Sequence, residues 1–412
     1  MIVSKLKDCR NRVESTVDWL KDENKNVVLY GAGYCGHEAG ELMRRHEIPI
    51  AAICDDFRAG EELDGVRISK IDDVTPNDDT VIFVTSGFNA KMKANLQKLG
   101  LMTYYNSTDF GRYDSEKENY RYFVDHRKQL NDAYELLSDE KSRRLFVNLA
   151  NYRISRDPKC LDGMEESMPQ YFPSEPNLDL THRGGGNEKH TFLDCGAYDG
   201  DTIRSFLKYV DGNYEKIIAV EAGRKNFERL KKNLADVPNV EYHNVGVFDR
   251  QTQLKFTDDD AKNSFIDESG ESVIEMDPID NILDDKPASF IKMDIEGAEY
   301  EALVGAEHTL KKYNPTLAVC VYHKVEDLYR LQLQIENTCP CAYDYYLRHY
   351  SPTVIETVLY AVPQCGFVKT EGDDKTMAEN IRIDSHKLIY HPCEVARWLN
   401  PGGGIEKRNL SD

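Results

Sequence analysis

The sequence predicts an α/β protein with two Rossmann-like, doubly wound units joined by a helical segment. Apolar strand-like runs alternate with helical runs over residues 26–106 and again over residues 191–363. A glycine-rich turn follows the first strand of each series and precedes a helix. Between the series, apolar residues recur at helical spacing over residues 114–151. We expect four parts: a first domain over 1–110, a helical connector and linker over 111–190, a second domain over 191–365, and a tail of unassigned role over 366–412.

The first unit begins with a βαβ pattern. The strand NVVLY leads through GAGYCG into a helical run that ends near His46, and IPIAAICDD forms the next strand. A polar, turn-rich stretch follows, and then the strand TVIFVTSG, a helix through Leu99 and a short strand that ends near Asn106. The connector after it is predicted to be helical up to Asn151, and the stretch from Asp157 to Lys189, rich in Pro, Gly and polar residues, is predicted to be a loop or linker.

The second unit repeats the alternation. TFLDCGAYDG and KIIAVEAG are predicted as strands with a helix between them, and VEYHNVGVFD as a single strand after a second helix. ASFIKMDIEG is predicted as a buried strand that ends in acids, followed by a helix and the strand TLAVCVYHK. AYDYYLRHY and ETVLYAVP are β-rich runs that would form an antiparallel pair at the end of the sheet.

Charge and apolar patterning limit the function classes. The formal net charge is −20, which repels nucleic-acid phosphates and anionic lipid, and no basic patch opposes it. No run of about 18 apolar residues predicts a membrane span, and the first residues have the pattern of a charged helix rather than a signal peptide. We therefore expect a cytoplasmic protein that acts on a small-molecule or glycan substrate, without nucleic acid or membrane as partner; a homo-oligomer is left open.

The sequence predicts neither disulfides nor a metal site. Its ten cysteines are scattered, and several lie in apolar runs, which suits reduced thiols. Cys339 and Cys341 lack the two-residue spacer and the second ligand pair of a structural zinc site. The acidic run from Asp258 to Asp260, with Asp267 and Glu268, lacks the spacing of a calcium-binding loop and is interpreted as a solvated loop.

GAGYCG has the spacing of a dinucleotide fingerprint, with Gly31, Gly33 and Gly36 between a strand and a helix. Such glycines allow a tight turn, a close approach of backbone N–H groups to a diphosphate, and close helix packing. Asp55 and Asp56 follow about 20 residues on, at the end of the next strand, where a ribose acceptor is expected. The turn predicts a nucleotide or nucleotide-sugar, and the alternative is a Rossmann turn that keeps its shape without a ligand.

DCGAYDG is a different turn, with Asp194, Gly196 and Gly200 after a strand and Glu221 at the end of the next strand. An acid at the turn disfavours a diphosphate but suits a ligand that carries an amino acid and a sulfonium. Glu221 would then accept both ribose hydroxyls. The alternative is an ordinary strand-to-helix turn with exposed acids.

The second unit, with the residues before it from about Gln170 and as far as Pro363, resembles the FkbM family of S-adenosylmethionine-dependent methyltransferases. The motifs DCGAYDGDT, VEAG, FIKMDIEGAEYEAL, AVCVYHK, YYLRHYS and ETVLYAVP occur in that order. The resemblance implies O-methylation of hydroxyls on sugars, glycans and related metabolites. It also implies S-adenosylmethionine contacts from Asp194, Gly196, Gly200 and Glu221, and a functional acid stretch at Asp294, Glu296 and Glu299. The first unit is similar to the small nucleotide-binding domain that precedes sugar acyltransferases.

Methyl transfer to oxygen needs an aligned acceptor and usually a base, and both are expected at the carboxyl ends of the strands. Asp294 and His323 are the candidate bases; Asp294 directly follows a buried strand and His323 has a pKa range suited to a base at neutral pH. Further candidates are Asn244 at the adenine edge and a substrate set of Glu296, Tyr322, Arg348, His349 and Tyr350.

Each candidate has a structural alternative. Glu296 suits capping of the next helix, His323 suits an exposed position beside Lys324, and Arg348 to Tyr350 suit a polar hairpin tip. Two other functions are also left open: an oxidoreductase that uses NAD or a nucleotide-sugar and is led by the first domain, and a non-catalytic protein that binds or senses a ligand. The retained acids and glycines of the second unit weigh against the non-catalytic alternative.

Overall fold

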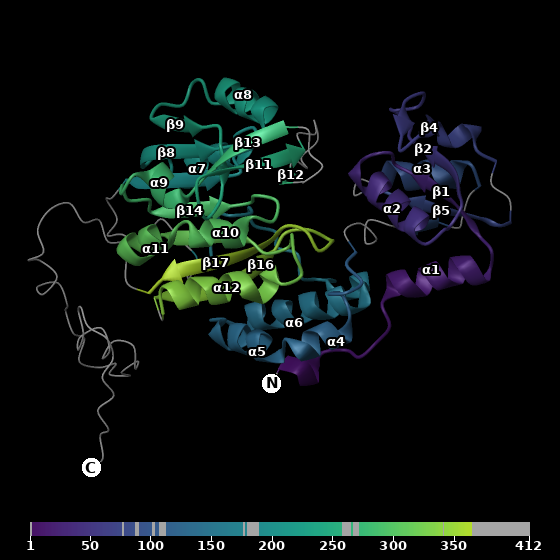
Figure 1. The fold of residues 1–412 in the computed structure, drawn as a ribbon, viewed down its shortest axis with the longest axis horizontal. Coiled ribbons are helices and arrows are strands. Elements are labelled where there is room, and N and C mark those ends of the chain that lie inside the picture. Colours follow the sequence, from purple (N-terminus) through teal and green to yellow (C-terminus); the bar gives the residue numbers. More distant parts are fainter. Residues whose placement is uncertain are drawn as a thin grey trace, which may run out of the picture.

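A computed structural model of the chain describes residues 2–75, 78–86, 90–100, 104–106, 113–175, 178, 189–257, 265–266, 272–340 and 342–364. Helices and largely parallel sheets alternate through this part of the chain, which confirms the α/β fold class (Figure 1). Within the same residues, no helix combines the length and the apolar character that crossing a bilayer requires. The predicted tail over 366–412, the RGGG run of the linker, the acidic run at Asp258 and Cys341 lie outside the described residues.

The first sheet has the strand order β3-β4-β2-β1-β5-β6. Its strands are β1 (Asn26–Tyr30), β2 (Ile50–Cys54), β3 (Glu62–Leu63), β4 (Val66–Ser69), β5 (Thr80–Val84) and β6 (Tyr104–Asn106), and its helices are α1 (Arg12–Asp22), α2 (Tyr34–Arg45) and α3 (Ala90–Lys98). The polar stretch before β5 forms the β3–β4 hairpin, which the sequence analysis did not predict. Asp64 and Gly65 both have positive φ there, at 52° and 77°, as a two-residue type I′ turn requires.

The connector folds into three helices: α4 (Tyr120–Asp125), α5 (Arg127–Leu136) and α6 (Glu140–Ser155). Figure 1 shows them beside α12 and β16 of the second unit. A buried ion cluster holds the connector together, because Glu118 is fully buried and accepts from the guanidinium groups of Arg153 and Arg156. Removing one partner of such a cluster would leave an uncompensated buried charge.

The second unit is built on a seven-stranded sheet of order β16-β17-β15-β14-β7-β8-β9. Its strands are β7 (His190–Cys195), β8 (Tyr214–Val220), β9 (Val240–His243), β14 (Phe290–Met293), β15 (Thr316–Cys320), β16 (Tyr343–His349) and β17 (Thr357–Pro363). Strands β16 and β17 form the predicted antiparallel pair, and β17 pairs antiparallel with β15. The helices are α7 (Asp201–Tyr209), α8 (Arg224–Asn233), α9 (Ile279–Leu283), α10 (Glu299–Val304), α11 (Glu307–Tyr313) and α12 (Asp327–Thr338).

The prediction of one strand over residues 240–249 is wrong. The run is divided between β9 of the seven-stranded sheet and β10 (Gly246–Val247) of a separate four-stranded sheet. That sheet also contains β11 (Thr252–Thr257), β12 (Phe265–Ile266) and β13 (Ser272–Asp277). The chain turns at Asn244, whose side-chain amide donates to the carbonyls of Glu221 and Ala222 at 2.9 and 3.1 Å. These hydrogen bonds hold Asn244 against the end of β8 and direct the following residues out of the sheet.

Four neighbouring parallel strands, β15, β14, β7 and β8, form the centre of the sheet. Their carboxyl ends lie at the same edge, where ligands of doubly wound sheets bind. The chain leaves β14 at Asp294, β7 at Gly196, β8 at Glu221 and β15 shortly before His323. The fold therefore brings most of the predicted site residues of the second unit to one edge.

Candidate functional site

A buried ion pair lies beneath the glycine turn that follows β7. Asp194 and Lys292 are direct register partners on β7 and β14, and their side chains are 0% and 3% exposed. The Lys292 Nζ lies 3.1 Å from Asp194 Oδ1 and donates to the Gly196 carbonyl at 2.7 Å. Burial raises the pKa of Asp194 to about 6, although Lys292 opposes this shift. Asp194 thus lies below the surface of the site and supports the turn from inside the sheet.

Gly196 is required by the packing of two strand ends. Its φ is +80°, and a Cβ atom there would lie 2.0 Å from the carbonyl oxygen of Asp294. The Asp294 amide donates to the Cys195 carbonyl at 3.1 Å, which continues the contact between β7 and β14. A side chain at position 196 would push the two turns apart. Gly200, at the start of α7, also has a positive φ, +91°. It packs against Leu234, which follows α8.

Glu221 is 7% exposed, and backbone groups fix its carboxylate. Oε2 accepts from the Tyr198 amide at 2.9 Å and Oε1 accepts from the Gly223 amide at 2.8 Å. Burial raises its pKa to about 6, against the effect of these two hydrogen bonds. Each oxygen keeps acceptor capacity for a ligand, because a carboxylate has about four acceptor sites. The predicted adenine-edge residue Asn244 acts here by fixing the backbone of Glu221.

Asp294 lies among hydrogen-bond donors at the end of β14. Tyr171 OH donates to Oδ2 at 2.9 Å and Tyr322 OH donates to Oδ1 at 3.0 Å. Burial alone would raise the pKa of Asp294, but Lys292, His323 and the two hydroxyls hold it below its usual value. Asp294 is therefore ionised at neutral pH.

His323 is buried rather than exposed beside Lys324, since its side chain is only 2% exposed. Its Nδ1 lies 3.0 Å from Glu299 Oε1, and its Nε2 lies 3.5 Å from Asp294 Oδ1 and 3.6 Å from Glu296 Oε2. Burial would lower the pKa of the imidazole, but the surrounding carboxylates raise it to about 9. At neutral pH the imidazole is a cation, which removes the ground for expecting His323 to act as the base.

Asp294, Glu299 and His323 have the residue types of a metal site, with one ligand atom of each within 4.8 Å of the others. The imidazole lies between the carboxylates, so that each ring nitrogen faces a different acid. One ion could be bound by only one of these nitrogens. The protonated imidazole itself supplies the positive charge that these acids need.

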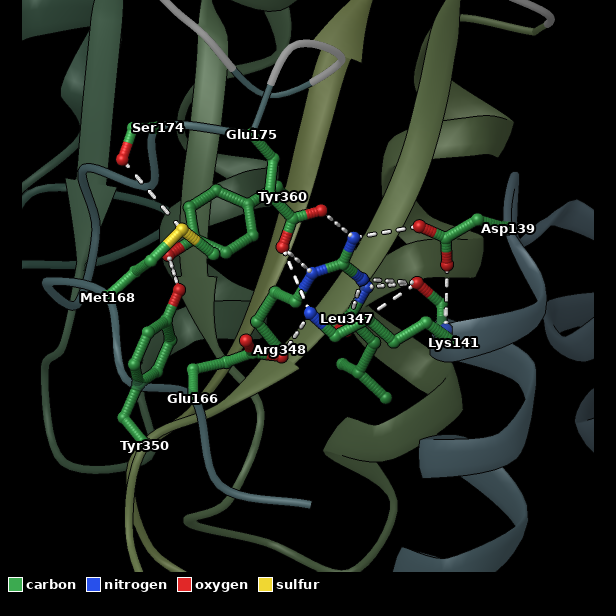
Figure 2. A network of polar contacts seen from close by, with 11 residues as sticks. Asp139, Lys141, Glu166, Met168, Ser174, Glu175, Leu347, Arg348, Tyr350 and Tyr360 are labelled. Atoms are coloured by element: carbon green, nitrogen blue, oxygen red, sulfur yellow. Dashed lines mark hydrogen bonds and ion pairs between the residues drawn. The ribbon is translucent and has the colours of Figure 1, made fainter. Parts of the chain in front are cut away.

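The structure separates the three predicted substrate residues at the end of β16. The Arg348 side chain is 1% exposed, and Figure 2 shows its guanidinium facing Asp139 and Glu175, at 2.7 and 2.6 Å. These ion pairs fix β16 to the connector. The two carboxylates accept from the N–H groups of Arg348 that would otherwise be available to a substrate. His349 is fully buried, its Nδ1 lies 2.8 Å from Thr357 Oγ1, and burial lowers its pKa to about 4.

Of these three residues, Tyr350 is connected to Asp294 by a chain of hydrogen bonds through Tyr360 and Tyr171. Its hydroxyl lies 2.7 Å from the hydroxyl of Tyr360, as Figure 2 also shows. Tyr360 OH accepts from the backbone amide of Tyr171 at 3.0 Å. Because Tyr171 donates to Asp294, Tyr350 belongs to the same hydrogen-bonded group of tyrosines as Tyr360 and Tyr171.

In the first unit, the structure distinguishes the three fingerprint glycines. A Cβ at Gly31 would lie 2.8 Å from the Thr85 carbonyl oxygen, and a Cβ at Gly36 would lie 2.0 Å from the Gly31 carbonyl oxygen. Nothing lies within 4 Å of a Cβ at Gly33. Gly31 and Gly36 are therefore required by packing, and Gly33 leaves space beside the turn.

The two acids of the first unit already accept hydrogen bonds from the protein. Asp55 Oδ2 accepts from the Ala32 amide at 3.0 Å, and Asp56 Oδ2 accepts from Tyr30 OH at 2.7 Å. The Ala32 amide is thus occupied by a carboxylate, at a position where the fingerprint would present it to a diphosphate.

Sequence reasoning missed Lys292 and Tyr171. Lys292 could have been found, because it is the one charged residue within the apolar run FIKM, and strand alternation places it on the same face as Asp294, two residues later. Tyr171 lies in the segment predicted to be a linker, where no periodicity indicates which side chain turns toward the sheet.

Comparison with known proteins identifies the second unit. Residues 194–356 match the family profile of the methyltransferase FkbM domain; this part of the chain is an FkbM methyltransferase domain, and the protein is a methyltransferase. No curated protein matches the sequence significantly.

Solved structures agree with the fold. A methyltransferase FkbM from Methylobacillus flagellatus KT is 22% identical, with a TM-score of 0.62, over 85% of this chain and 94% of that chain. An rRNA methylase from Streptococcus thermophilus and fibrillarin from Aeropyrum pernix, solved with S-adenosyl-L-methionine, are 12% and 13% identical. They cover 43% of this chain each and 89% and 67% of their own chains, at TM-scores of 0.29, too low to support a conclusion here.

We predict that Lys292→Met destabilises the protein by about 3 to 5 kcal/mol, because it leaves Asp194 as an uncompensated buried charge. Urea unfolding of the full chain measures the effect. The double variant Lys292→Met, Asp194→Asn should be more stable than Lys292→Met alone, since it removes that charge. Equal stability of the double and single variants would contradict the assignment of the pair.

Proposed function

We propose that this FkbM-family methyltransferase transfers a methyl group from S-adenosylmethionine to a hydroxyl of a sugar, glycan or related metabolite. The observation that carries the proposal is the ionised carboxylate of Asp294, which lies next to the Gly196 turn at the edge of the sheet where Glu221 also lies. One carboxylate for the acceptor and one for the cofactor thus lie at the same edge of the sheet, after β14 and β8, which flank β7.

The residues present suit the cofactor. S-adenosylmethionine supplies an electrophilic methyl group on a sulfonium, and its positive charge favours a site that carries carboxylates. Glu221 would accept from the ribose hydroxyls with its remaining lone pairs, since its two backbone donors already fix its orientation. Gly196 and Gly200 would form the floor of the site, with Asp194 and Lys292 beneath it.

Asp294 suits the acceptor hydroxyl. An alcohol oxygen becomes strongly acidic once it bonds to the methyl carbon, so a carboxylate with a low pKa can still receive its proton. His323 is already protonated and would instead hold Asp294, Glu296 and Glu299 in place by its charge. The hydroxyls and rings of Tyr171, Tyr322 and Tyr350 would suit a sugar, which presents both hydroxyls and apolar C–H faces.

For the first unit we propose that a nucleotide or nucleotide-sugar binds beside Gly33 and helps to position or sense the acceptor. The open space at Gly33 supports it, whereas the Asp55 contact with Ala32 weighs against a diphosphate on that amide. Cytoplasmic location remains an expectation from the sequence.

Glu221→Ala should weaken the binding of S-adenosylmethionine and its demethylated product by about 1.5 to 3 kcal/mol, because two charge-assisted hydrogen bonds are lost. Titration calorimetry on the full chain measures both ligands. Glu228→Ala, on the partly exposed face of α8, is the matched control and should keep wild-type affinity. Unchanged affinity in Glu221→Ala would place the ribose elsewhere.

Asp294→Asn should lower turnover about 100- to 10,000-fold while the affinity for S-adenosylmethionine stays near normal, since only the group that faces the acceptor changes. Transfer of a radiolabelled methyl group to a panel of sugars and glycans supplies the assay. Wild-type turnover in this variant would exclude Asp294 as the proton acceptor.

The pH profile should distinguish Asp294 from His323. With a His323 pKa of about 9, the imidazolium is present below that pH and lost above it, so activity should fall as pH rises through about 9. The low pKa of Asp294 predicts no acidic limb near neutral pH. His323→Gln should remove the alkaline limb. An acidic limb near pH 6 to 7 that disappears in His323→Gln would instead identify neutral His323 as the base.

Gly33→Val should abolish binding of nucleotides or nucleotide-sugars to the first unit without unfolding it, because a Cβ at this position meets no protein atom within 4 Å. Calorimetry with UDP-sugars and NADH tests the binding, and S-adenosylmethionine affinity is the internal control, since distant sites rarely couple. Oxidation of NADH by the wild-type chain with a sugar substrate would favour the oxidoreductase alternative.

A further inference from the structure

Tyr171 belongs to a segment that precedes the matched FkbM domain, yet it contacts the centre of the candidate site. The segment is anchored to β16, because the Glu166 amide donates to the His349 carbonyl at 2.7 Å and Glu165 forms an isolated bridge with His349. Gln170 donates to the carboxylate of Glu356, before β17. These contacts hold the segment across the strand ends from which Asp294 projects.

Both ends of Tyr171 are fixed. Its backbone amide donates to Tyr360 OH at 3.0 Å, and its own hydroxyl donates to Asp294 Oδ2 at 2.9 Å. The residue is 6% exposed, and Lys292 Nζ lies 5.3 Å from the centre of its ring. The ring is thus held between the buried lysine and the carboxylate.

The backbone of Tyr171 is strained. Its φ is +68°, in the left-handed region that bulky side chains rarely adopt. Such strain persists only where surrounding contacts fix the residue, and it is concentrated at functional sites. The strained conformation directs the hydroxyl to Asp294 while the amide stays on Tyr360.

We propose that Tyr171 is a positioning residue for methyl transfer: it fixes the orientation of the Asp294 carboxylate toward the acceptor, so that the segment before residue 194 completes the active site formed by residues 194–356. Tyr322 holds the other oxygen of Asp294, from the end of β15. With Oδ1 and Oδ2 each held by one tyrosine, rotation of the carboxylate is restricted and its remaining lone pairs have defined directions. The kinetic part of this inference rests on the proposed function.

Tyr171→Phe removes the hydroxyl and keeps the ring. The charged groups that act on Asp294, which are Lys292 of β14, His323 after β15 and Asp194 of β7, remain. Loss of one donor to the charged form should therefore raise the titration midpoint of Asp294 by about one unit. Carbon NMR of aspartate-labelled protein measures this midpoint, with Asp294→Asn to assign the signal. This measurement needs no turnover, so it decides the inference even if the proposed function fails.

In the methyl-transfer assay, Tyr171→Phe should lower kcat about tenfold, with little change in the KM for S-adenosylmethionine. In the Asp294→Asn background the same substitution should change kcat less than about twofold, because the residue acts through Asp294. Tyr329→Phe is the matched control. Its hydroxyl pairs with Tyr122 between α12 and α4, so both the midpoint and kcat should stay at wild-type values.

An unchanged Asp294 midpoint in Tyr171→Phe would overturn the inference. So would an equal loss of kcat in the wild-type and Asp294→Asn backgrounds, which would indicate a structural role. If Tyr171→Phe does not fold, Tyr360→Phe decides, because it keeps Tyr171 and the ring of Tyr360 and removes the hydroxyl that accepts from the Tyr171 amide and contacts Tyr350 OH. It should move the Asp294 midpoint in the same direction by a smaller amount, and no movement would count against the inference.

Discussion

The buried ammonium of Lys292 is the interaction on which the rest of the site depends. Asp194 lies near the end of β7 and Asp294 directly follows the neighbouring strand β14, and both carboxylates are close to the same low-dielectric interior. Without a cation between them, like charges and desolvation would favour protonation of at least one acid. Lys292 supplies the charge from inside the sheet, where it also donates to the Gly196 carbonyl. It thereby links the charge balance of the site to the shape of the glycine turn.

Lys292 acts on both carboxylates, and their other surroundings explain why they have different properties. Asp194 is fully buried and its pKa is raised, while Asp294 accepts from two tyrosines and lies beside the His323 cation, so that its pKa is lowered. Environments that separate the pKa values of neighbouring acids are a general means of assigning them different roles. Here the inner acid supports the turn, and the outer acid stays ionised at the edge where a ligand would bind.

Sequence reasoning predicted what depends on periodicity and strand order. Because parallel strands end at one edge, the positions of Gly196, Glu221 and Asp294 followed from the alternation of strands and helices alone. It could not predict where side-chain contacts redirect the chain, as at Asn244, which ends β9 by bonding to the neighbouring turn. It also could not predict the state of His323, because an imidazole has a pKa near 9 only when several carboxylates surround it, and these come from Asp294, Glu296 and Glu299 in a different strand–helix turn.

Arg348 is a second residue whose partners the sequence could not predict. An Arg beside a predicted hairpin tip suited an anionic substrate, but Asp139 and Glu175, more than 170 residues earlier in the chain, take its donors. The connector therefore contributes to the second unit in two ways: it neutralises a buried arginine of β16, and it carries Tyr171 to Asp294.

A third contact extends this dependence to the strand end beside Asp294. Arg153 of α6 donates to the Tyr322 carbonyl at 2.6 Å and is itself held by Glu118. The side chain of Asn11, which caps α1 of the first unit, donates to the Glu118 carbonyl at 3.1 Å. Buried polar contacts thus run from the start of the first unit, through the connector, to the residue that holds one oxygen of Asp294. Since each of these groups would cost free energy if left unpaired, the geometry of the Asp294 carboxylate depends on parts of the chain well outside residues 194–356.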